Sequence, residues 1–518
     1  MNETTPKLVI ICIDGARPDI VRSFDIFSPP FAVPDTGPRR LRSVFPSSTA
    51  TAHASFLTGA DTAGHGIVGN RFWNGEPVEG IFQRADNPLA SLHPYEFGSL
   101  TADSWLNRLT VRGATSAAIH FPHTFDLSDN DPSAAVFCLY APTRRLKVAI
   151  ADAGCAAEAA TTTYFGEEVT ASANRTQGGN ALILSIRAEN GSWSSDIEPN
   201  SQHRVAFDIA AGRVSAYCSW QQISSDEIEL TITTAVLTMF FGELDLPWDP
   251  DNESTHPATS VPSYTASGVN DFFESPRAEW VREVALSTAG AVSPEILLIR
   301  FNQIDHAQEF LYWQACRGSG ATRRQAREEI IETYDLVDRC VSTIVESIGP
   351  GADYVIFSDH GIETVDRHIG LNAILRECGL ARDMTFQGDS HIAYLYVDGT
   401  MKKTQLERLE TQLRSTDESV NILSDSDLEQ LRLPAGSPRV GSLAVMCGPH
   451  CKFTYNLSDA RVAVVQSASH GNVISDPDMD GVIRMFGPNA LLVPVPDAIV
   501  ECAEVIESLW KLQTKGTC

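Results

Sequence analysis

The sequence predicts an α/β fold in which helices flank a mostly parallel central sheet. Three apolar runs support this prediction: Lys7–Ile13, Glu295–Phe301 and Asp353–Phe357. Such runs are typical of strands that are buried on both faces of a parallel sheet. The first run ends before Asp14, and the third ends shortly before Asp359. Because the carboxyl ends of parallel strands meet at one edge of the sheet, we expect these two carboxylates to lie close together.

Histidines accompany the same pattern. His360 directly follows Asp359, and His470 follows a fourth apolar run, Val462–Val465, after a short polar segment. We therefore expect a further buried strand at this position, with an imidazole at its end. Carboxylate oxygens and imidazole nitrogens are common ligands of divalent metal ions. The strand ends therefore predict a metal centre.

A hydroxyl-rich segment, Phe45–Gly59, predicts a loop followed by a short helix that begins near Ser48 and Thr49. A helix N-terminus favours anions, and a hydroxyl held there is well placed to attack phosphorus. Ser and Thr are also the preferred N-cap residues, so capping alone is the simpler explanation of this segment considered by itself.

Together these residues resemble the type I phosphodiesterase/nucleotide pyrophosphatase branch of the alkaline phosphatase superfamily. In that branch a Thr or Ser nucleophile precedes a Thr-Gly pair, and an Asn follows in a His-Gly-x-x-x-Asn turn. Thr49, Thr58–Gly59 and His65–Asn70 match this order. The matching set extends over most of the chain and comprises Asp14, Thr49, Asn70, Asp305, Asp359, His360 and His470.

The resemblance implies a metal-dependent phosphoric ester hydrolase that acts on a small molecule, cleaving diesters or phosphoanhydrides. Thr49 would be the nucleophile and would form a phospho-threonine intermediate, while Asn70 would donate a hydrogen bond to a phosphoryl oxygen. Two divalent ions are expected, with Zn²⁺ favoured, and Thr49 would be a further metal ligand that bridges or approaches both. The implied ligands are Asp14, Asp359 and His360 for one ion, and Asp305, Glu309 and His470 for the other.

Position 309 departs from the family pattern, which has a His four residues after the Asp. Glu309 stands there instead, and its carboxylate shifts preference from Zn²⁺ towards harder ions such as Mn²⁺ or Mg²⁺. A second register pairs Asn302 with His306. We favour Asp305 with Glu309, because this register keeps the carboxylate, and retain His306 as an alternate ligand.

Several functional alternatives accompany this prediction. Within the superfamily they are cleavage of a phosphonate C–P bond and phosphomonoester hydrolysis. From another class comes a non-catalytic binding or scaffold protein with a degenerate metal site, suggested by Glu309 alone. Arg71 and Trp73 follow Asn70 directly, so they are candidates for substrate binding, although aromatic side chains after a turn more often pack in the interior.

The resemblance implies an alkaline-phosphatase-like core, and composition predicts two inserts in it. The β-type runs Ala181–Ala188, Val214–Trp220 and Ile228–Leu237 indicate an antiparallel β insert, which the linker Pro247–Ser267 follows. A smaller cap-like insert comes later. The expected parts are core 1–146, β-rich insert 147–245, core 246–364, cap-like insert 365–460 and core 461–518.

The net charge restricts the classes of binding partner, and the cysteine content indicates the cellular compartment. The 518 residues have a formal net charge of −27, which disfavours long nucleic acids and anionic membranes as partners. The N-terminal residues lack a secretory signal, and no stretch has the length of a membrane span. The 11 cysteines are mostly isolated, as in reduced proteins. We therefore expect a cytoplasmic protein.

Overall fold

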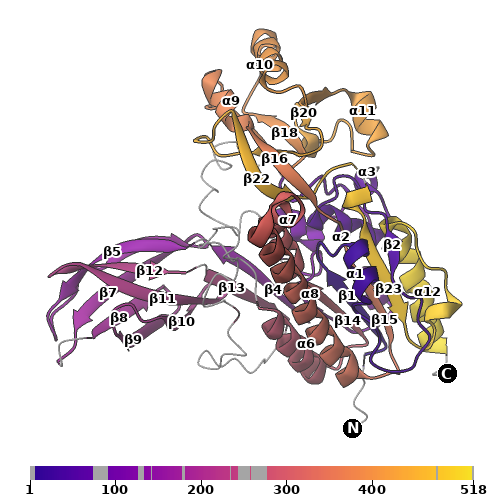
Figure 1. The fold of residues 1–518 in the computed structure, drawn as a ribbon, viewed down its shortest axis with the longest axis horizontal. Helices are drawn as coiled ribbons and strands as arrows, with labels where there is room; N and C mark the ends of the chain where they lie inside the picture. The colour runs from indigo at the N-terminus through magenta and orange to yellow at the C-terminus, as the bar shows by residue number, and fades with distance from the viewer. Residues whose placement is uncertain are drawn as a thin grey trace.

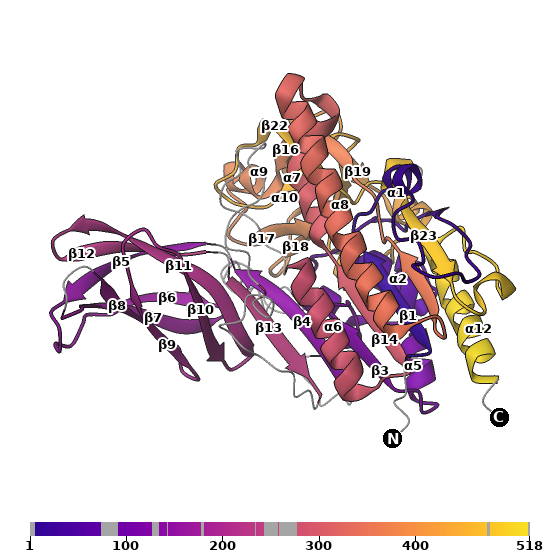
Figure 2. The same cartoon turned by 60° about the horizontal axis from the view of Figure 1, so that its bottom comes forward.

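The computed structural model describes residues 6–73, 92–126, 134–141, 143–177, 181–233, 235–242, 257, 277–473 and 477–515. Figures 1 and 2 show a helix-flanked core, a β-rich lobe extending from one side of it, and a small α/β cap at one end. Apart from Pro257, the predicted linker Pro247–Ser267 lies outside the described residues.

The core is built on a mostly parallel group of strands. In spatial order these are β15 (Asp353–Phe357), β1 (Leu8–Ile13), β14 (Ile296–Phe301), β3 (Ser116–Ile119) and β4 (Ala134–Ala141). Each neighbouring pair in this group is parallel. Beyond β15 the sheet ends in two antiparallel strands, β23 (Gly481–Phe486) and β2 (Arg39–Leu41). The three strands predicted from apolar runs are therefore confirmed, and they are adjacent.

Helices cover both faces of this sheet. Alternate residues of β1 pack in opposite directions, so that Val9, Ile11 and Ile13 belong to one hydrophobic cluster and Leu8, Ile10 and Cys12 to the other. The first cluster includes residues of α6 (Ala278–Val292), α7 (Gln303–Arg317) and α8 (Gly320–Ile348). The second includes residues of α2 (Thr49–Thr58), α5 (Trp105–Thr110) and α12 (Cys502–Lys515). Two short helices, α1 (Pro18–Phe24) and α3 (Thr62–His65), lie on the loops around the core.

None of the described helices is both long enough and apolar enough to cross a membrane.

The β-rich lobe continues the central sheet rather than standing apart from it, because β13 pairs with β4 of the core. Its strands are β5 (Arg144–Ala151), β6 (Ala160–Tyr164), β7 (Glu167–Arg175), β8 (Leu182–Arg187), β9 (Ser192–Ile197), β10 (His203–Ile209), β11 (Gly212–Ser224), β12 (Glu227–Ile232) and β13 (Ala235–Phe241). The predicted single run Ile228–Leu237 is in fact two strands, β12 and β13. They lie on different parts of β11, so one straight strand cannot make both pairings.

The cap contains two small sheets with helices around them (Figure 1). One sheet has the order β17 (Met384–Gly388), β18 (Ile392–Val397), β20 (Leu443–Met446) and β19 (Asn421–Leu423). The helices are α9 (Leu371–Glu377), α10 (Lys403–Thr416) and α11 (Asp425–Gln430). The other sheet, β21 (Cys451–Thr454), β16 (Glu363–Gly370) and β22 (Val462–Ser469), joins the cap to the core.

The prediction of a buried strand at Val462–Val465 was wrong about burial, although a strand is present at this position. These residues begin β22, which pairs antiparallel with β16 outside the central sheet, and Val464 is 88% exposed. Exposed and half-buried positions alternate along residues 462–467, and only Ala468 and Ser469 at the end of the strand are buried. An apolar run of four residues therefore does not distinguish a core strand from a strand at the surface.

Candidate active site

The three predicted carboxylates lie together at the carboxyl edge of the central sheet. Asp14 directly follows β1, Asp359 follows β15, and Asp305 lies in the first turn of α7 after β14. Among the described residues, three groups of side chains each offer ligand atoms that all lie within 4.8 Å of one another. Two of them share His360 and form this centre: Asp14, Asp359 and His360, and Asp305, His360 and His470. The third comprises Cys12, His53 and Asp359. The parallel register of the strands thus assembles an acidic and imidazole-rich centre.

His470 reaches this centre although β22 lies outside the central sheet. The antiparallel pairing of β22 with β16 places Ser469 opposite Glu363, shortly after Asp359 and His360 in sequence. The rings of His360 and His470 stack with centroids 3.9 Å apart. His470 Nδ1 donates to the Ser47 carbonyl at 3.1 Å, and His360 Nδ1 donates to the Gly361 carbonyl at 3.0 Å. These bonds fix both rings and, in neutral imidazoles, leave the Nε2 lone pairs for ligation.

The donor atoms fit a bound divalent cation. Within the described part of the chain, Asp14 Oδ1, Asp305 Oδ1 and Asp359 Oδ2 are buried without a hydrogen-bond partner. Asp14 Oδ1 also lies 3.2 Å from His360 Nε2. A buried carboxylate oxygen without a partner is costly, by about 1–3 kcal/mol or more for a charged group. Hard oxygens and imidazole nitrogens together suit Zn²⁺, Mn²⁺ or similar ions, which would satisfy all of these atoms.

Electrostatics in the centre also favour a cation. Burial and the neighbouring Asp14 raise the pKa of Asp359 to about 7, and burial and Asp14 raise the pKa of Asp305 well above its ordinary value. Burial alone would lower the pKa of His360, but Asp359 and Asp14 raise it to about 10. The carboxylates therefore either retain protons or draw one onto His360, and a divalent ion would replace these protons.

Thr49 is the first residue of α2, and its hydroxyl faces the centre. Thr49 Oγ1 lies 3.4 Å from His360 Nε2, and the side chain is buried. Ser48 is the N-cap residue, but its side chain makes no capping hydrogen bond and instead lies 3.2 Å from Thr51 Oγ1. Capping by Ser48 therefore does not account for the hydroxyl-rich segment.

Asn70 supplies the capping interaction instead. Its Oδ1 accepts a hydrogen bond from the backbone N–H of Ala50 at 2.8 Å. Because an N–H group can only donate, this bond orients the amide and leaves the NH₂ group of Asn70 free to donate elsewhere. Asn70 borders the same cavity as Thr49. One residue thus fixes the start of α2 and presents a donor beside the hydroxyl.

Asp389, a cap residue that sequence reasoning missed, holds this turn in place. Its Oδ1 accepts from the Asn70 backbone N–H at 2.8 Å. Burial raises the pKa of Asp389 to about 6. The backbone of Gly69 packs against the same carboxylate so closely that a Cβ there would lie 2.7 Å from Asp389 Oδ2. No sequence motif marks Asp389, since its contacts depend on how the cap folds onto the core.

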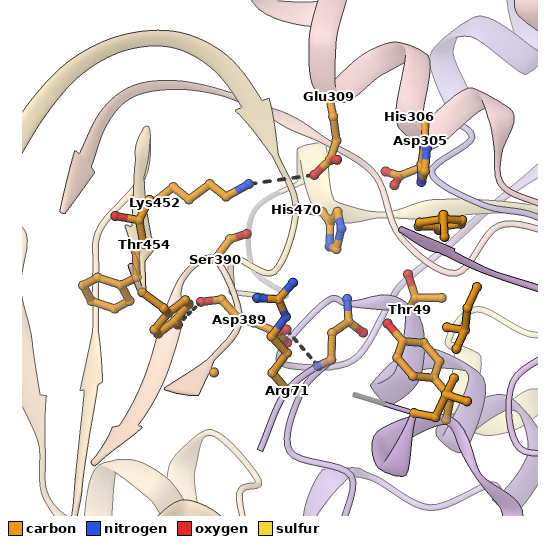
Figure 3. A pocket seen from close by; sticks show the side chains of 18 of the residues that line it. Thr49, Arg71, Asp305, His306, Glu309, Asp389, Ser390, Lys452, Thr454 and His470 are labelled. Atoms are coloured by element: carbon orange, nitrogen blue, oxygen red, sulfur yellow. Dashed lines mark hydrogen bonds and ion pairs between the residues drawn. The ribbon is translucent and has the colours of Figure 1, made fainter. Parts of the chain in front are cut away.

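Glu309 and His306 lie on α7 beside the centre, but neither belongs to its two compact groups (Figure 3). Glu309 Oε1 lies 3.9 Å from Lys452 Nζ of the cap. The His306 ring stands edge-on to Tyr140 at 5.7 Å. Of the two predicted registers, the structure brings Asp305 into the centre, and Asn302 is the N-cap residue of α7.

A cavity of about 480 Å³ opens over the centre. Its described lining includes Thr49, Arg71 and His470 from the core and Lys452 and Tyr455 from the cap. Trp73 is not among the described lining residues, and its ring packs against Tyr396 of β18 at 5.6 Å. Of the two residues predicted to follow Asn70 into a substrate site, only Arg71 therefore borders the cavity.

A parallel sheet with Asp and His side chains at its carboxyl edge and a hydroxyl at a helix N-terminus defines a hydrolase of the alkaline phosphatase superfamily. The chain belongs to the family described as type I phosphodiesterase/nucleotide pyrophosphatase, whose family model matches residues 8–146 and 193–472. It is accordingly an enzyme that hydrolyses phosphoric ester or phosphoanhydride bonds, in a superfamily that depends on divalent metal ions.

Two solved structures of ectonucleotide pyrophosphatase/phosphodiesterase 5 show the same fold. Human ectonucleotide pyrophosphatase/phosphodiesterase 5 matches with a TM-score of 0.51 and 12% identity, over 97% of this chain and 94% of that chain. An inactive variant of the murine enzyme in complex with AMP matches with a TM-score of 0.50, the same identity and the same coverage. Phosphonoacetate hydrolase from Sinorhizobium meliloti 1021, in complex with phosphonoformate, matches with a TM-score of 0.48 and 14% identity, over 98% and 96% of the two chains. No curated protein matches by sequence.

Proposed function

We propose that the protein is a metal-dependent phosphodiesterase or pyrophosphatase that acts on a small molecule through Thr49. The observation that best supports this proposal is the position of the Thr49 hydroxyl, at the N-terminus of α2 and 3.4 Å from His360 Nε2. His360 belongs to both compact groups of ligand atoms. A hydroxyl at this position would adjoin both metal ions.

The proposed ligands follow the two groups. Asp14, Asp359 and His360 would hold one ion, and Asp305 and His470 the other, with Glu309 as its third ligand after a small movement of the side chain away from Lys452. When bound, two divalent ions supply Lewis-acid activation of the hydroxyl and stabilise charge on the attacking and leaving oxygens. Zn²⁺ is the favoured ion, and Glu309 makes Mn²⁺ or Mg²⁺ acceptable at the second position.

The protein's own groups position the reaction. Thr49 Oγ attacks phosphorus, the bond from phosphorus to the leaving oxygen breaks, and a phospho-threonine forms that water then hydrolyses. The free NH₂ group of Asn70 donates to a non-bridging phosphoryl oxygen as negative charge develops there. The N-terminus of α2 adds the favourable field of the helix dipole. Ser47 and Gly361 keep the two imidazoles oriented through their carbonyl groups.

Charge and volume support a small anionic substrate. Arg71 and Lys452 line the cavity, and their positive charges favour an anionic ligand. The net charge of −27 on the whole protein disfavours the binding of long polyanions. A cavity of about 480 Å³ has the size of ligand sites for single small molecules. The preference for diesters over monoesters rests on the pairing of a Thr nucleophile with Asn70.

A comparison of two chromogenic substrates tests the proposal. The metal-depleted protein is supplied with Zn²⁺ or Mn²⁺ and assayed with bis(4-nitrophenyl) phosphate and 4-nitrophenyl phosphate, while release of phosphate from phosphonoacetate is followed in parallel. We expect metal-dependent hydrolysis that is faster for the diester. Faster cleavage of the monoester or the phosphonate, or equal rates without metal, would contradict the proposed reaction.

A further inference from the structure

A buried arginine lies directly beside one of the proposed metal ligands. Arg300 is the fifth residue of β14, opposite Cys12 of β1, and only 6% of its surface is exposed. Its Nε donates to Asp14 Oδ2 at 2.9 Å, and its Nη2 donates to the same oxygen. Its Nη1 lies 3.3 Å from His120 Nε2. A guanidinium therefore forms part of the floor of the cavity.

A charge buried at this position requires a partner of opposite charge. Charged side chains are almost never fully buried unless they are paired, because removing them from water is expensive. The remaining residues of β14 are apolar and wholly buried, so Arg300 is the one charged side chain in this central strand. Asp14, which is also fully buried, is the partner that compensates it.

The two carboxylate oxygens of Asp14 make different contacts. Oδ2 accepts both hydrogen bonds from Arg300, whereas Oδ1 has no hydrogen-bond partner within the described residues and lies 3.2 Å from His360 Nε2. Two hydrogen bonds from one guanidinium group to the same oxygen restrict rotation of the carboxylate group. Oδ1 is thereby directed towards the position at which Asp359 and His360 also offer ligand atoms.

We propose that Arg300 is a positioning residue of the metal centre, which fixes Oδ2 of Asp14 and so presents Oδ1 as the ligand. This inference rests on the proposed metal-dependent function. Its role is indirect, since Arg300 would act through Asp14 rather than on the ion. Groups that orient metal ligands in this way typically account for 10- to 100-fold in metal affinity.

The test uses full-length Arg300→Met and Arg300→Lys variants. Each is stripped of metal, and Zn²⁺ is titrated in competition with a chromogenic chelator, which measures stoichiometry and affinity without any turnover. We expect Arg300→Met to bind one of two ions about 10- to 100-fold more weakly than the wild type. Arg300→Lys should fall between the two, because lysine keeps the charge but lacks the planar fork.

Arg484 offers a control for the loss of a buried arginine from an ion pair, with partners that are more exposed than Asp14. It is 6% exposed in β23, and it donates to Asp35 Oδ2 at 2.7 Å and to Asp25 Oδ1 at 2.9 Å, neither of which is a proposed ligand. Arg484→Met should lower the metal-free thermal midpoint, as Arg300→Met does, but leave Zn²⁺ affinity unchanged. A purely structural role for Arg300 would give the same pattern as this control.

The outcomes separate the inference from the function on which it rests. If the wild type binds Zn²⁺ and both Arg300 variants bind it equally well or more tightly, Arg300 does not position Asp14 and the inference fails. If the wild type itself binds no divalent ion, the proposed function fails first. Should Arg300→Met not fold, the affinity of Arg300→Lys decides, since the proposal requires it to be weaker than that of the wild type.

Discussion

Substitution of Asn70 should separate two effects of one side chain. Asn70→Ala removes both the acceptor that caps α2 and the donor that we assign to the phosphoryl oxygen. Asn70→Asp keeps an acceptor for the Ala50 N–H, which lies 2.8 Å from Oδ1, but replaces the NH₂ group by a second oxygen. Asn70→Asp keeps both the size of the side chain and the helix cap, whereas Asn70→Ala loses both.

The structure sets the expected magnitudes. Loss of a capping hydrogen bond costs about 1 kcal/mol of stability, within a range of about 0.5–2. Asn70→Ala should show this loss, whereas Asn70→Asp should not, since a negative charge near a helix N-terminus is favourable by about 0.3–1 kcal/mol. Loss of one donor to a developing oxyanion lowers kcat by about 10²–10³. Both variants should show this decrease, and Asn70→Asp should show the larger one because its charge repels the phosphoryl oxygens.

Urea unfolding and steady-state hydrolysis of the diester measure the two effects on the same preparations. The reasoning would be refuted if Asn70→Ala lost stability but kept the wild-type kcat. In that case Asn70 would only cap the helix, and the donor to the phosphoryl oxygen would have to be sought elsewhere.

The remaining predictions concern four other positions. Thr49→Ala should abolish turnover but leave bound metal nearly unchanged, as measured by elemental analysis, because the Asp and His side chains proposed as ligands are retained; retained turnover would exclude Thr49 as the nucleophile. Glu309→Ala should release one metal ion and His306→Ala none, and the reverse result would mean that the other register supplies the ligands. His65 is neutral and buried, with Nδ1 accepting from the Ile67 N–H at 3.1 Å, and burial lowers its pKa to about 3. This folded-state pKa lies below the unfolded value of about 6.5, so protonation of His65 favours the unfolded chain. The contribution of His65 to the free energy of unfolding is therefore complete above about pH 6.5, and it decreases by about 1.4 kcal/mol per pH unit as the pH falls towards 3. His65→Asn keeps an acceptor near the Nδ1 position but cannot titrate, so urea unfolding of the metal-free protein at about pH 7 and about pH 5 should show a smaller decrease than in the wild type; an equal decrease would contradict this assignment.

The core of the fold was predictable because its determinants are local. Strands buried on both faces are apolar at almost every position, so β1, β14 and β15 are visible as nearly continuous apolar runs in the sequence. Helix α8 is similarly visible from its apolar stripe at three- and four-residue spacing. The exposed strand β22 has a run of the same kind but lies in another sheet, because sequence pattern does not specify the pairing partner.

The centre was predictable only in part. Asp14 and Asp359 follow strands directly, so the strand pattern alone places them at one edge. Asp389, Arg300 and Lys452 escaped notice because each reaches the site through contacts between segments distant in sequence. Arg300 did leave a signal, a single charge within a central apolar strand, but its partner Asp14 is 286 residues away.

The most direct test of the account is to trap the enzyme during turnover. The wild type is mixed with the diester substrate in the presence of Zn²⁺, quenched in acid, digested and analysed by mass spectrometry, with Thr49→Ala as control. We predict a phosphoryl adduct of the substrate on the peptide that contains Thr49, and on no peptide of the variant. An adduct on another residue, or turnover that continues in Thr49→Ala, would contradict the central claim that Thr49 is the nucleophile of a metal-dependent phosphodiesterase.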